Sequence, residues 1–459
     1  MKSIGFIDLF KIKWLLVVTF ISVTWVNFNQ EKWKNKDVIQ HDIINYYSYL
    51  PALFYERDLS LSFLNDTLNK QAEGAHYWPN KTPEGNHVIK MSMGMAVTYF
   101  PFFCLAHIYA KIFDYDIDGF SQPYHFAVLF STLFYFLIGL LYAWKILRLH
   151  FSESLSFLTL FFICFGTNVF FYLTIAGGLS HTIGFTIIAL FIYYTILWHQ
   201  KLSWKYSILL GALFGLAVLV RPINGLVLLF LLLYNVKSFK DIRLKINFFL
   251  SNLSKFCMVL FVSFLIFSPQ LIYWKYVTGH YVFNSYVGEH FFFQNPHVLS
   301  GLFSFRKGWL VYTPIMVFSL IGIFFLRHDL KKYKTSVVLF FCCYVYVAFS
   351  WWCWWYGGSF GQRVLIDIYP LLAIPFAAFL LKIQAIKPLH MKITYSTLFA
   401  LVLLNLFQTM QIKYNIIHYD SMTRANYFEI FLTTTKKADR EKYLQHPDYE
   451  KARKGIDEY

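Results

Sequence analysis

Long apolar runs separated by polar loops are the feature that most limits how this chain can fold. Only 14% of the residues are charged and 57% are hydrophobic, whereas soluble proteins carry about 25% charged residues. Runs of this length are typical of transmembrane helices, so we predict an all-α, polytopic membrane protein with about eleven spans. The runs lie near residues 14–28, 91–113, 124–144, 155–173, 182–199, 206–220, 223–236, 256–274, 309–326, 335–350, 364–381 and 394–412.

The basic residues orient these spans. A net charge of +16 would suggest a nucleic-acid partner for a soluble protein, but here lysine and arginine stand between apolar runs, where they mark cytoplasmic loops. We therefore expect no nucleic-acid partner. The polar loop 29–90 and the tail 413–459 are expected outside, with residues 1–412 as one membrane domain. The basic loops lie at residues 145–148, 201–205, 237–255, 327–334 and 382–392.

Two segments should depart from simple crossings. The loop 29–90 and the acidic stretch 114–118 are both expected outside, so the run 91–113 between them should be re-entrant or lie along the outer face. Arg221-Pro222 separates two short runs. Proline cannot continue the preceding helix but often begins the next one, so this pair predicts a tight turn.

The first outer loop contains the least ordinary stretch, residues 40–60. Asp42 stands at the entrance of a predicted helix, and Glu56 and Asp58 follow Pro51. Tyrosines and aliphatic residues fill the space between them, which favours a helix in the membrane interface with carboxylates facing water. A loop helix with solvated charges is the alternative.

The unusual polar residues gather in the outer loops rather than near the middle of the spans. Transporters usually hold ionisable groups near the bilayer midplane, so this distribution favours an enzyme at the outer face. A transporter or flippase of a lipid-linked glycan, or an inactive membrane scaffold, remains an alternative. The six cysteines form no metal motif or disulfide framework, and no cofactor is evident. A divalent ion at Asp42 with Glu56 or Asp58 stays open.

The order of several motifs resembles the GT-C superfamily of polytopic glycosyltransferases, which includes aminoarabinose–lipid A transferases and protein O-mannosyltransferases. The resemblance rests on HD-x₃-YY-x₂-LP in the first loop, followed by VIKMSMGMAVTYFPFF, GGLSHTIGF, LVRPINGLVLL, SFRKGWLVYTP and WWYGGSFGQRVLIDIYP. It implies an isoprenoid-phosphate sugar as donor, inverting transfer, and a periplasmic or lumenal active site. It covers most of residues 1–380.

The resemblance also implies roles for single residues. Asp42 matches the acidic catalytic residue of the first loop, and Lys90 matches a basic residue that holds the donor phosphate. Arg221 stands where relatives have a basic residue near the site, whereas His181 replaces an acidic residue. We expect transfer of the sugar to a hydroxyl of a lipid, glycan or protein at the periplasmic face of a bacterial inner membrane. Asp42 is the expected general base, and the expected substrate-binding residues are Lys90, Arg221, Arg306, Arg363, Glu56, Asp58 and His181.

Each of these residues also has a simpler structural interpretation. Asp42 could cap its helix, because aspartate is a preferred N-cap residue. Lys90 and Arg221 could anchor helices at the lipid headgroups. Arg363 and Asp367 are four residues apart and could pair with each other on a helix. Glu289 and His181 could be surface residues.

Overall fold

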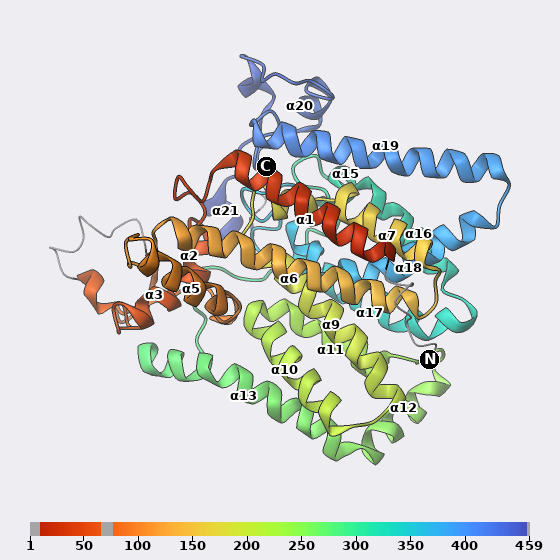
Figure 1. Ribbon diagram of the computed structural model, residues 1–459, viewed down its shortest axis with the longest axis horizontal. Helices are drawn as coiled ribbons and strands as arrows, with labels where there is room; N and C mark the ends of the chain where they lie inside the picture. Colours follow the sequence, from red (N-terminus) through yellow and green to blue (C-terminus); the bar gives the residue numbers. More distant parts are fainter. Residues whose placement is uncertain (1–9, 66–76, 457–459) are drawn as a thin grey trace.

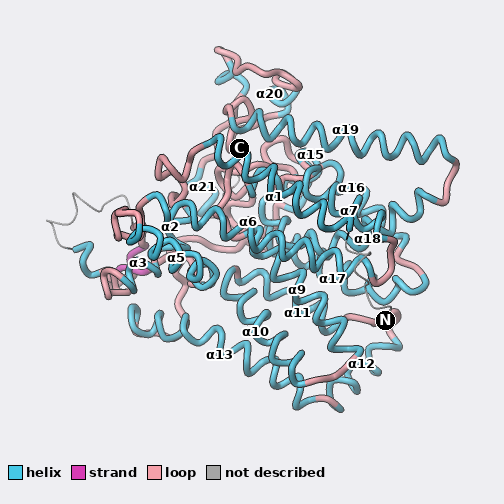
Figure 2. The backbone as a smooth tube through the Cα atoms, in the orientation of Figure 1, coloured by secondary structure: helices cyan, strands magenta, loops and turns pink. Residues whose placement is uncertain are grey.

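The computed structural model describes residues 10–65 and 77–456, and they are almost entirely helical (Figure 1). The only strands among them are β1 (Asn80–Lys81) and β2 (His87–Val88), which form one antiparallel pair with Asn80 opposite Val88. Figure 2 shows this pair beside the first-loop helices. The expected all-α fold is confirmed.

Eight helical stretches in the described residues are long and apolar enough to cross a membrane, so the chain is a multi-pass membrane protein. Four shorter apolar stretches accompany them, and if Gly94–Ile112 does not cross, the expected number of about eleven spans requires all four to cross. The long helices are α1 (Phe10–Gln30), α5 (Gly94–Ile112), α6 (Gln122–Arg148), α9 (His181–Gln200), α13 (Leu253–Thr278), α17 (Lys331–Phe349), α18 (Tyr369–Gln384) and α19 (Pro388–Lys413).

The shorter apolar helices are α7 (Glu153–Gly166), α10 (Trp204–Val220), η3 (Pro222–Val227) with α11 (Leu228–Leu233), and η4 (Pro314–Met316) with α16 (Val317–Gly322) and η5 (Ile323–Phe325). Proline explains two of the breaks. Helix α10 ends at Val220, the backbone of the next residue, Arg221, is extended, and Pro222 then begins η3. The turn predicted at Arg221-Pro222 is therefore confirmed. Pro314 begins η4 in the same way.

Helix α18 forms the centre of the bundle. The stretch Arg363–Gln384 is almost entirely buried, and α18 packs against α7, α9 and α16. Gly322 of α16 faces the carbonyl of Pro375 so closely that a Cβ at position 322 would overlap it. A helix that is apolar on all sides needs such a fully enclosed position.

Helix α5 accompanies only the first half of α6. The Tyr135 hydroxyl donates to the carbonyl of Thr98, while His107 near the other end of α5 lies 3.3 Å from the Tyr124 hydroxyl. The two helices are thus antiparallel, and the rest of α6 packs on α9. This arrangement agrees with the prediction that residues 91–113 enter and leave on the same side of the membrane. The re-entrant course of residues 91–113 remains a prediction, because it concerns the membrane itself.

The first-loop helices α2 (Asp42–Tyr47) and α3 (Tyr49–Phe54) pack into the protein beside α5 (Figure 1). Nine of their twelve residues are buried, and their tyrosines bond to neighbouring segments. Tyr47 donates to the carbonyl of Gly119, and Tyr49 donates to the carbonyl of Met91. The apolar and tyrosine side chains of these helices are thus enclosed by the protein, while Glu56 and Arg57 after them are exposed.

The chain after α19 folds back onto the helix bundle near Trp352 and Trp355. It forms three short elements, and Tyr449 packs edge-on against Trp352 and Trp355. The three elements are α20 (Arg424–Glu429), η8 (Arg440–Tyr443) and α21 (Tyr449–Arg453). The remaining elements are η2 (Ser62–Asn65), α8 (Val169–Leu173), α12 (Lys240–Ser251), α14 (Val298–Phe303), α15 (Trp309–Tyr312), η6 (His328–Leu330) and η7 (Arg363–Ile368).

Candidate functional site

Asp42 forms an ion pair with an arginine from the far part of the chain. Its Oδ2 accepts a hydrogen bond from Arg363 Nη2 at 2.8 Å. The Asp42 side chain is 34% exposed and that of Arg363 is 15% exposed. His41, rather than Asp42, takes the N-cap position, with a positive φ of 50°. The capping interpretation of Asp42 is therefore wrong, and its carboxylate stays open to an incoming group.

A second carboxylate lies nearby in a closed setting. His181 Nδ1 is 2.9 Å from Asp367 Oδ1, and both side chains are almost fully buried. Arg221 Nη1 lies 2.5 Å from His181 Nδ1 and 3.1 Å from Nε2. With the proton assigned to Nδ1, His181 donates to Asp367, and the Arg221 guanidinium lies against the imidazole ring. We call this chain of side chains the Asp367 relay.

Neighbouring helices fix Asp367 in the relay. Asn224 Nδ2 donates to Asp367 Oδ2 at 2.9 Å, and the Tyr344 hydroxyl lies 3.1 Å from Asn224 Oδ1. Gly184 on α9 lies so close that a Cβ would meet Asp367 Oδ2. A glycine is therefore needed where α9 passes this carboxylate.

Arg363 and Asp367 do not make the helical pair that their spacing allowed. Arg363 bonds to Asp42, and Asp367 bonds to His181 and Asn224. Both residues lie on η7, a 3₁₀ helix with about three residues per turn, so positions four apart point in different directions. The pairing interpretation is wrong for this reason.

Tyr46 connects the Asp42 pair with the Asp367 relay. Its hydroxyl is 3.1 Å from Ser180 Oγ, directly before His181. Burial raises the pKa of Tyr46, and the charges of Asp42, Arg221 and Arg363 also act on it. Two arginines and one carboxylate thus act on one buried tyrosine.

Lys90 forms a third pair. Its Nζ lies 2.5 Å from Glu289 Oε1, and Trp352 Nε1 donates to Glu289 Oε2 at 3.0 Å. Glu289 is only 8% exposed, so its interpretation as a surface residue is wrong. Burial raises the pKa of Tyr286, beside Lys90, and the charges of Arg221, Asp42 and Glu289 also reach Tyr286. Lys90 therefore lies in the same electrostatic environment as Asp42.

Arg306 faces the C-terminal tail rather than Asp42. Its Nη1 donates to the carbonyl of Asp420 at 3.0 Å, and its guanidinium lies over the Trp355 ring. The neighbouring Lys307 donates to the carbonyl of Ser359. Burial lowers the pKa of Lys307 to about 7, against the raising effect of Asp420. These two residues join the tail to the loop before Arg363.

Asp58 is held within its own loop. Both oxygens of Asp58 accept bonds from its own loop, from the backbone and hydroxyls of Ser60 and Ser62. Burial raises the pKa of Asp58, but these hydrogen bonds outweigh it and lower the pKa overall. Glu56 is exposed at the end of α3. Asp58 thus shapes a turn, and the metal pairing with Asp42 finds no support in these contacts.

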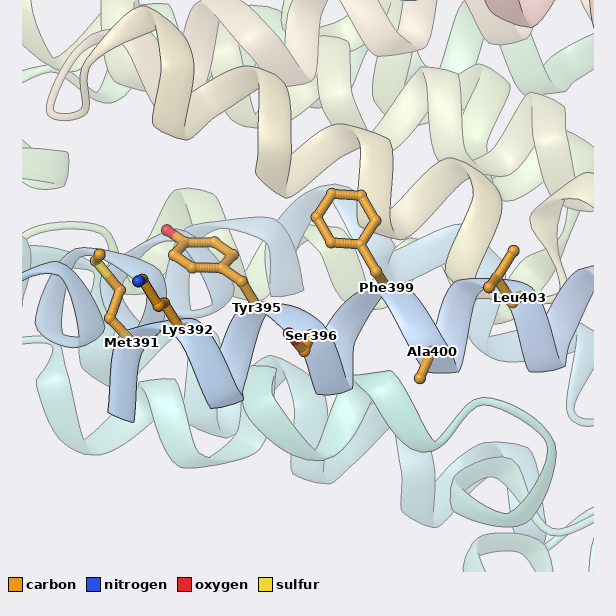
Figure 3. Close-up of a pocket in the computed structure, with 7 residues that line it drawn as sticks. All are labelled: Met391, Lys392, Tyr395, Ser396, Phe399, Ala400 and Leu403. Carbon is orange, nitrogen blue, oxygen red and sulfur yellow. The ribbon is translucent and has the colours of Figure 1, made fainter. Parts of the chain in front are cut away.

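A groove lies elsewhere, away from these charged residues. It has a volume of about 650 Å³ and runs along one face of α19 (Figure 3). Its lining is mostly apolar and includes Tyr395, Phe399 and Leu403. None of the candidate site residues borders it.

One group in the described residues has the composition of a metal site. His418, Asp420 and His446 of the tail offer ligand atoms that all lie within 4.8 Å of one another. Sequence reasoning missed this group because His446 stands far along the chain from His418. It also missed the His181–Asp367 contact, although Asp367 was the conspicuous charge within a span.

Comparison with known proteins adds one match. No curated protein matches the chain. A family model covers residues 105–273, which include His181 and Arg221 but neither Asp42 nor Arg363. The match supports a membrane glycosyltransferase that uses a sugar linked to a polyprenyl phosphate. Over these residues the chain is similar to the dolichyl-phosphate-mannose-protein mannosyltransferase family, a GT-C-type family, and the resemblance drawn from the sequence is confirmed.

Proposed function

We propose that the protein transfers a sugar from a polyprenyl-phosphate carrier to a hydroxyl of a lipid, glycan or protein, with inversion at the anomeric carbon. The observation that carries this proposal is the Asp42–Arg363 pair. It is a carboxylate one third exposed, held by a guanidinium and close to a second arginine through Tyr46. A base that is fixed in place yet reachable is what activation of a hydroxyl requires.

Asp42 is the proposed general base. The acceptor hydroxyl gives its proton to the Asp42 carboxylate as its oxygen attacks the anomeric carbon of the donor sugar. The bond from that carbon to the phosphate oxygen breaks, and polyprenyl phosphate leaves with the electron pair. Arg363 orients the Asp42 carboxylate, because Asp42 Oδ2 accepts a hydrogen bond from Arg363 Nη2.

Arginines and a lysine stabilise the leaving phosphate, on which negative charge grows as the bond breaks. His181 contacts the Arg221 guanidinium and is itself bonded to Asp367, so these two residues fix the orientation of the guanidinium. Lys90 is paired with Glu289 and would exchange this partner for the phosphate. Glu289 keeps a hydrogen bond from Trp352 after such an exchange.

Transport of a lipid-linked glycan finds less support. His181 is the first residue of α9, and Asp367 lies within five residues of the start of its apolar stretch. The buried charges therefore gather at one end of the bundle, whereas a transport pathway needs them near the midplane. An inactive scaffold would not need a carboxylate kept open beside two arginines.

The proposed site faces the periplasm of a bacterial inner membrane, because the basic loops occupy the other end of the bundle. Single cysteines at positions 80 and 116, in a chain without its native cysteines, test this. We expect an impermeant thiol reagent added from outside to label both. Labelling of position 116 only after permeabilisation would show that residues 91–113 cross, and would overturn the sidedness.

The reaction itself is tested in proteoliposomes that contain polyprenyl-phosphate mannose. We expect wild-type protein to release free polyprenyl phosphate when lipid, glycan and peptide hydroxyl acceptors are supplied, and to leave the intact donor on its original side. Movement of intact donor between leaflets without release of polyprenyl phosphate would overturn the enzyme and favour the flippase. The assay is repeated with a second polyprenyl-phosphate sugar. Release of polyprenyl phosphate from that donor but not from the mannose donor would show that the protein is a transferase with another sugar specificity.

A further inference from the structure

Helix α12 lies at the opposite end of α9 from the candidate site (Figure 1). Lys245 of α12 donates from Nζ to His199 Nε2 at 2.5 Å and to the carbonyl of Tyr234 at 2.8 Å. His199 stands in the last turn of α9, whereas His181 of the candidate site is the first residue of that helix. An inference about α12 therefore does not rest on the proposed function.

The chain enters a long apolar helix directly after α12. Helix α12 ends at Ser251, and α13 begins at Leu253. Lys255 Nζ, in the first turn of α13, lies 5.6 Å from the centre of the Trp204 ring, and Trp204 is the first residue of α10. Two apolar helices thus begin at one level beside a tryptophan and a lysine, which are typical of the lipid headgroup region. Helix α12 therefore lies at the depth of the headgroups.

One side of α12 packs on the protein, and another side is apolar and exposed. Phe248 and Phe249 pack against Trp198 of α9. Away from them stand Ile242, Ile246 and Leu250, which are four residues apart, share one side of the helix and are all exposed. We call these three residues the apolar stripe. An exposed apolar stripe on a helix that also carries basic residues is typical of a helix lying in the membrane interface.

Two basic residues stand beside the apolar stripe. Lys240 and Arg243 are three residues apart, so they share a side of α12, and both are exposed. The single acidic residue of α12 is Asp241. Its Oδ2 accepts the backbone N–H groups of Lys237 and Ser238 at 2.9 Å, so this carboxylate stabilises the turn before the helix. Cations next to an apolar stripe match the two parts of an anionic lipid, which are its phosphate and its acyl chains.

We propose that α12 is a binding site for anionic phospholipids. The apolar stripe enters the boundary of the acyl chains, and Lys240 and Arg243 bind the headgroup phosphates. The Arg243 guanidinium can donate to two phosphate oxygens, whereas Lys240 acts as a point charge. A lipid with a net negative charge is preferred over phosphatidylcholine, because the choline cation already neutralises the phosphate of that lipid. The bond from Lys245 to His199 holds α12 so that the apolar stripe stays turned away from α9.

Lipid quenching of a fluorophore on α12 tests this proposal. Full-length protein without its native cysteines carries the fluorophore at Ile246→Cys and is placed in nanodiscs that contain spin-labelled phosphatidylglycerol or spin-labelled phosphatidylcholine. We expect stronger quenching by phosphatidylglycerol, and a preference that falls as salt is added. Each basic residue near the surface contributes about fivefold, so Lys240→Gln with Arg243→Gln should remove most of the preference. Lys436→Gln, which changes an exposed lysine of the tail, should leave the preference unchanged.

Lys240 and Arg243 are exposed, so the double variant should fold, and an unfolding midpoint equal to that of the parent protein verifies this. The salt dependence of the parent protein needs no variant at all. Equal quenching by the two lipids in the parent protein would overturn the proposal. Quenching by aqueous iodide instead of by either lipid would show that the apolar stripe faces water or awaits a protein partner, and would overturn it as well. An unchanged preference in the double variant would assign the lipid contact to other basic loops and contradict the site.

Discussion

Asp42 and Asp367 are two carboxylates that act on arginines at the same end of the bundle, yet their surroundings differ. Asp42 is 34% exposed and bonds to Arg363, whereas Asp367 is fully buried and bonds to both His181 and Asn224. The enclosed carboxylate has its acceptor positions filled by the protein. The open one has a position left for a substrate. Within one site, Asp367 therefore positions its neighbours, whereas Asp42 is able to react with a substrate.

The largest expected effect on stability comes from breaking the enclosed group. Asp367→Ala leaves Arg221 and His181 without their buried partner, which typically costs about 3–5 kcal/mol. Asp42→Ala removes a partly exposed pair, which is worth about 0–1 kcal/mol. Denaturant unfolding in detergent compares the two variants with wild type. Equal losses of unfolding free energy would remove the distinction between the two carboxylates.

The Lys90–Glu289 pair sharpens the comparison, because it should change partners during the reaction. Lys90→Met should weaken donor binding, since a charge-assisted hydrogen bond contributes about 1.5–3 kcal/mol, or roughly ten- to a hundredfold in affinity. Glu289→Gln should strengthen binding instead, because it frees the lysine from its competitor. Competition by polyprenyl phosphate measures both. Unchanged affinity in both variants would make the pair purely structural.

Lys307 gives a smaller effect that depends on pH. Burial lowers its pKa from 10.5 to about 7. Between these values the unfolded chain holds a proton that the folded chain has released, so stability from this group rises as pH rises from about 7 to 10.5. Lys307→Met should flatten this part of the curve of unfolding midpoint against pH. The same slope in wild type and variant would show that Lys307 keeps its proton in the folded protein.

The sequence predicted what local patterns control. Apolar runs marked the helices, and Arg221-Pro222 marked a break, because proline acts on its own backbone wherever it stands. The buried first-loop helices were anticipated only in part. Their tyrosines indicated partners, but the partners on α5 and at Gly119 depend on how distant segments meet.

Pairings within the site could not be read in the same way. Asp42 and Arg363 are 321 positions apart, and no local pattern joins them. The helical pairing of Arg363 with Asp367 failed because η7 is a 3₁₀ helix. Asp58 was set beside Asp42 by its charge, yet two serines just after it satisfy that charge locally. Charged residues in the sequence indicate candidates for the site, but which of them contact each other depends on the fold.

The most direct measurement is the rate of sugar transfer by Asp42→Asn. The amide oxygen can still accept from Arg363, but the side chain cannot take a proton from the acceptor. Asp37→Asn is the matched control, because Asp37 is an exposed carboxylate of the same loop that pairs with Gln40. We predict that Asp42→Asn lowers the transfer rate about 10²- to 10⁴-fold with donor binding retained, while Asp37→Asn transfers normally. Turnover near the wild-type rate in Asp42→Asn would contradict the account.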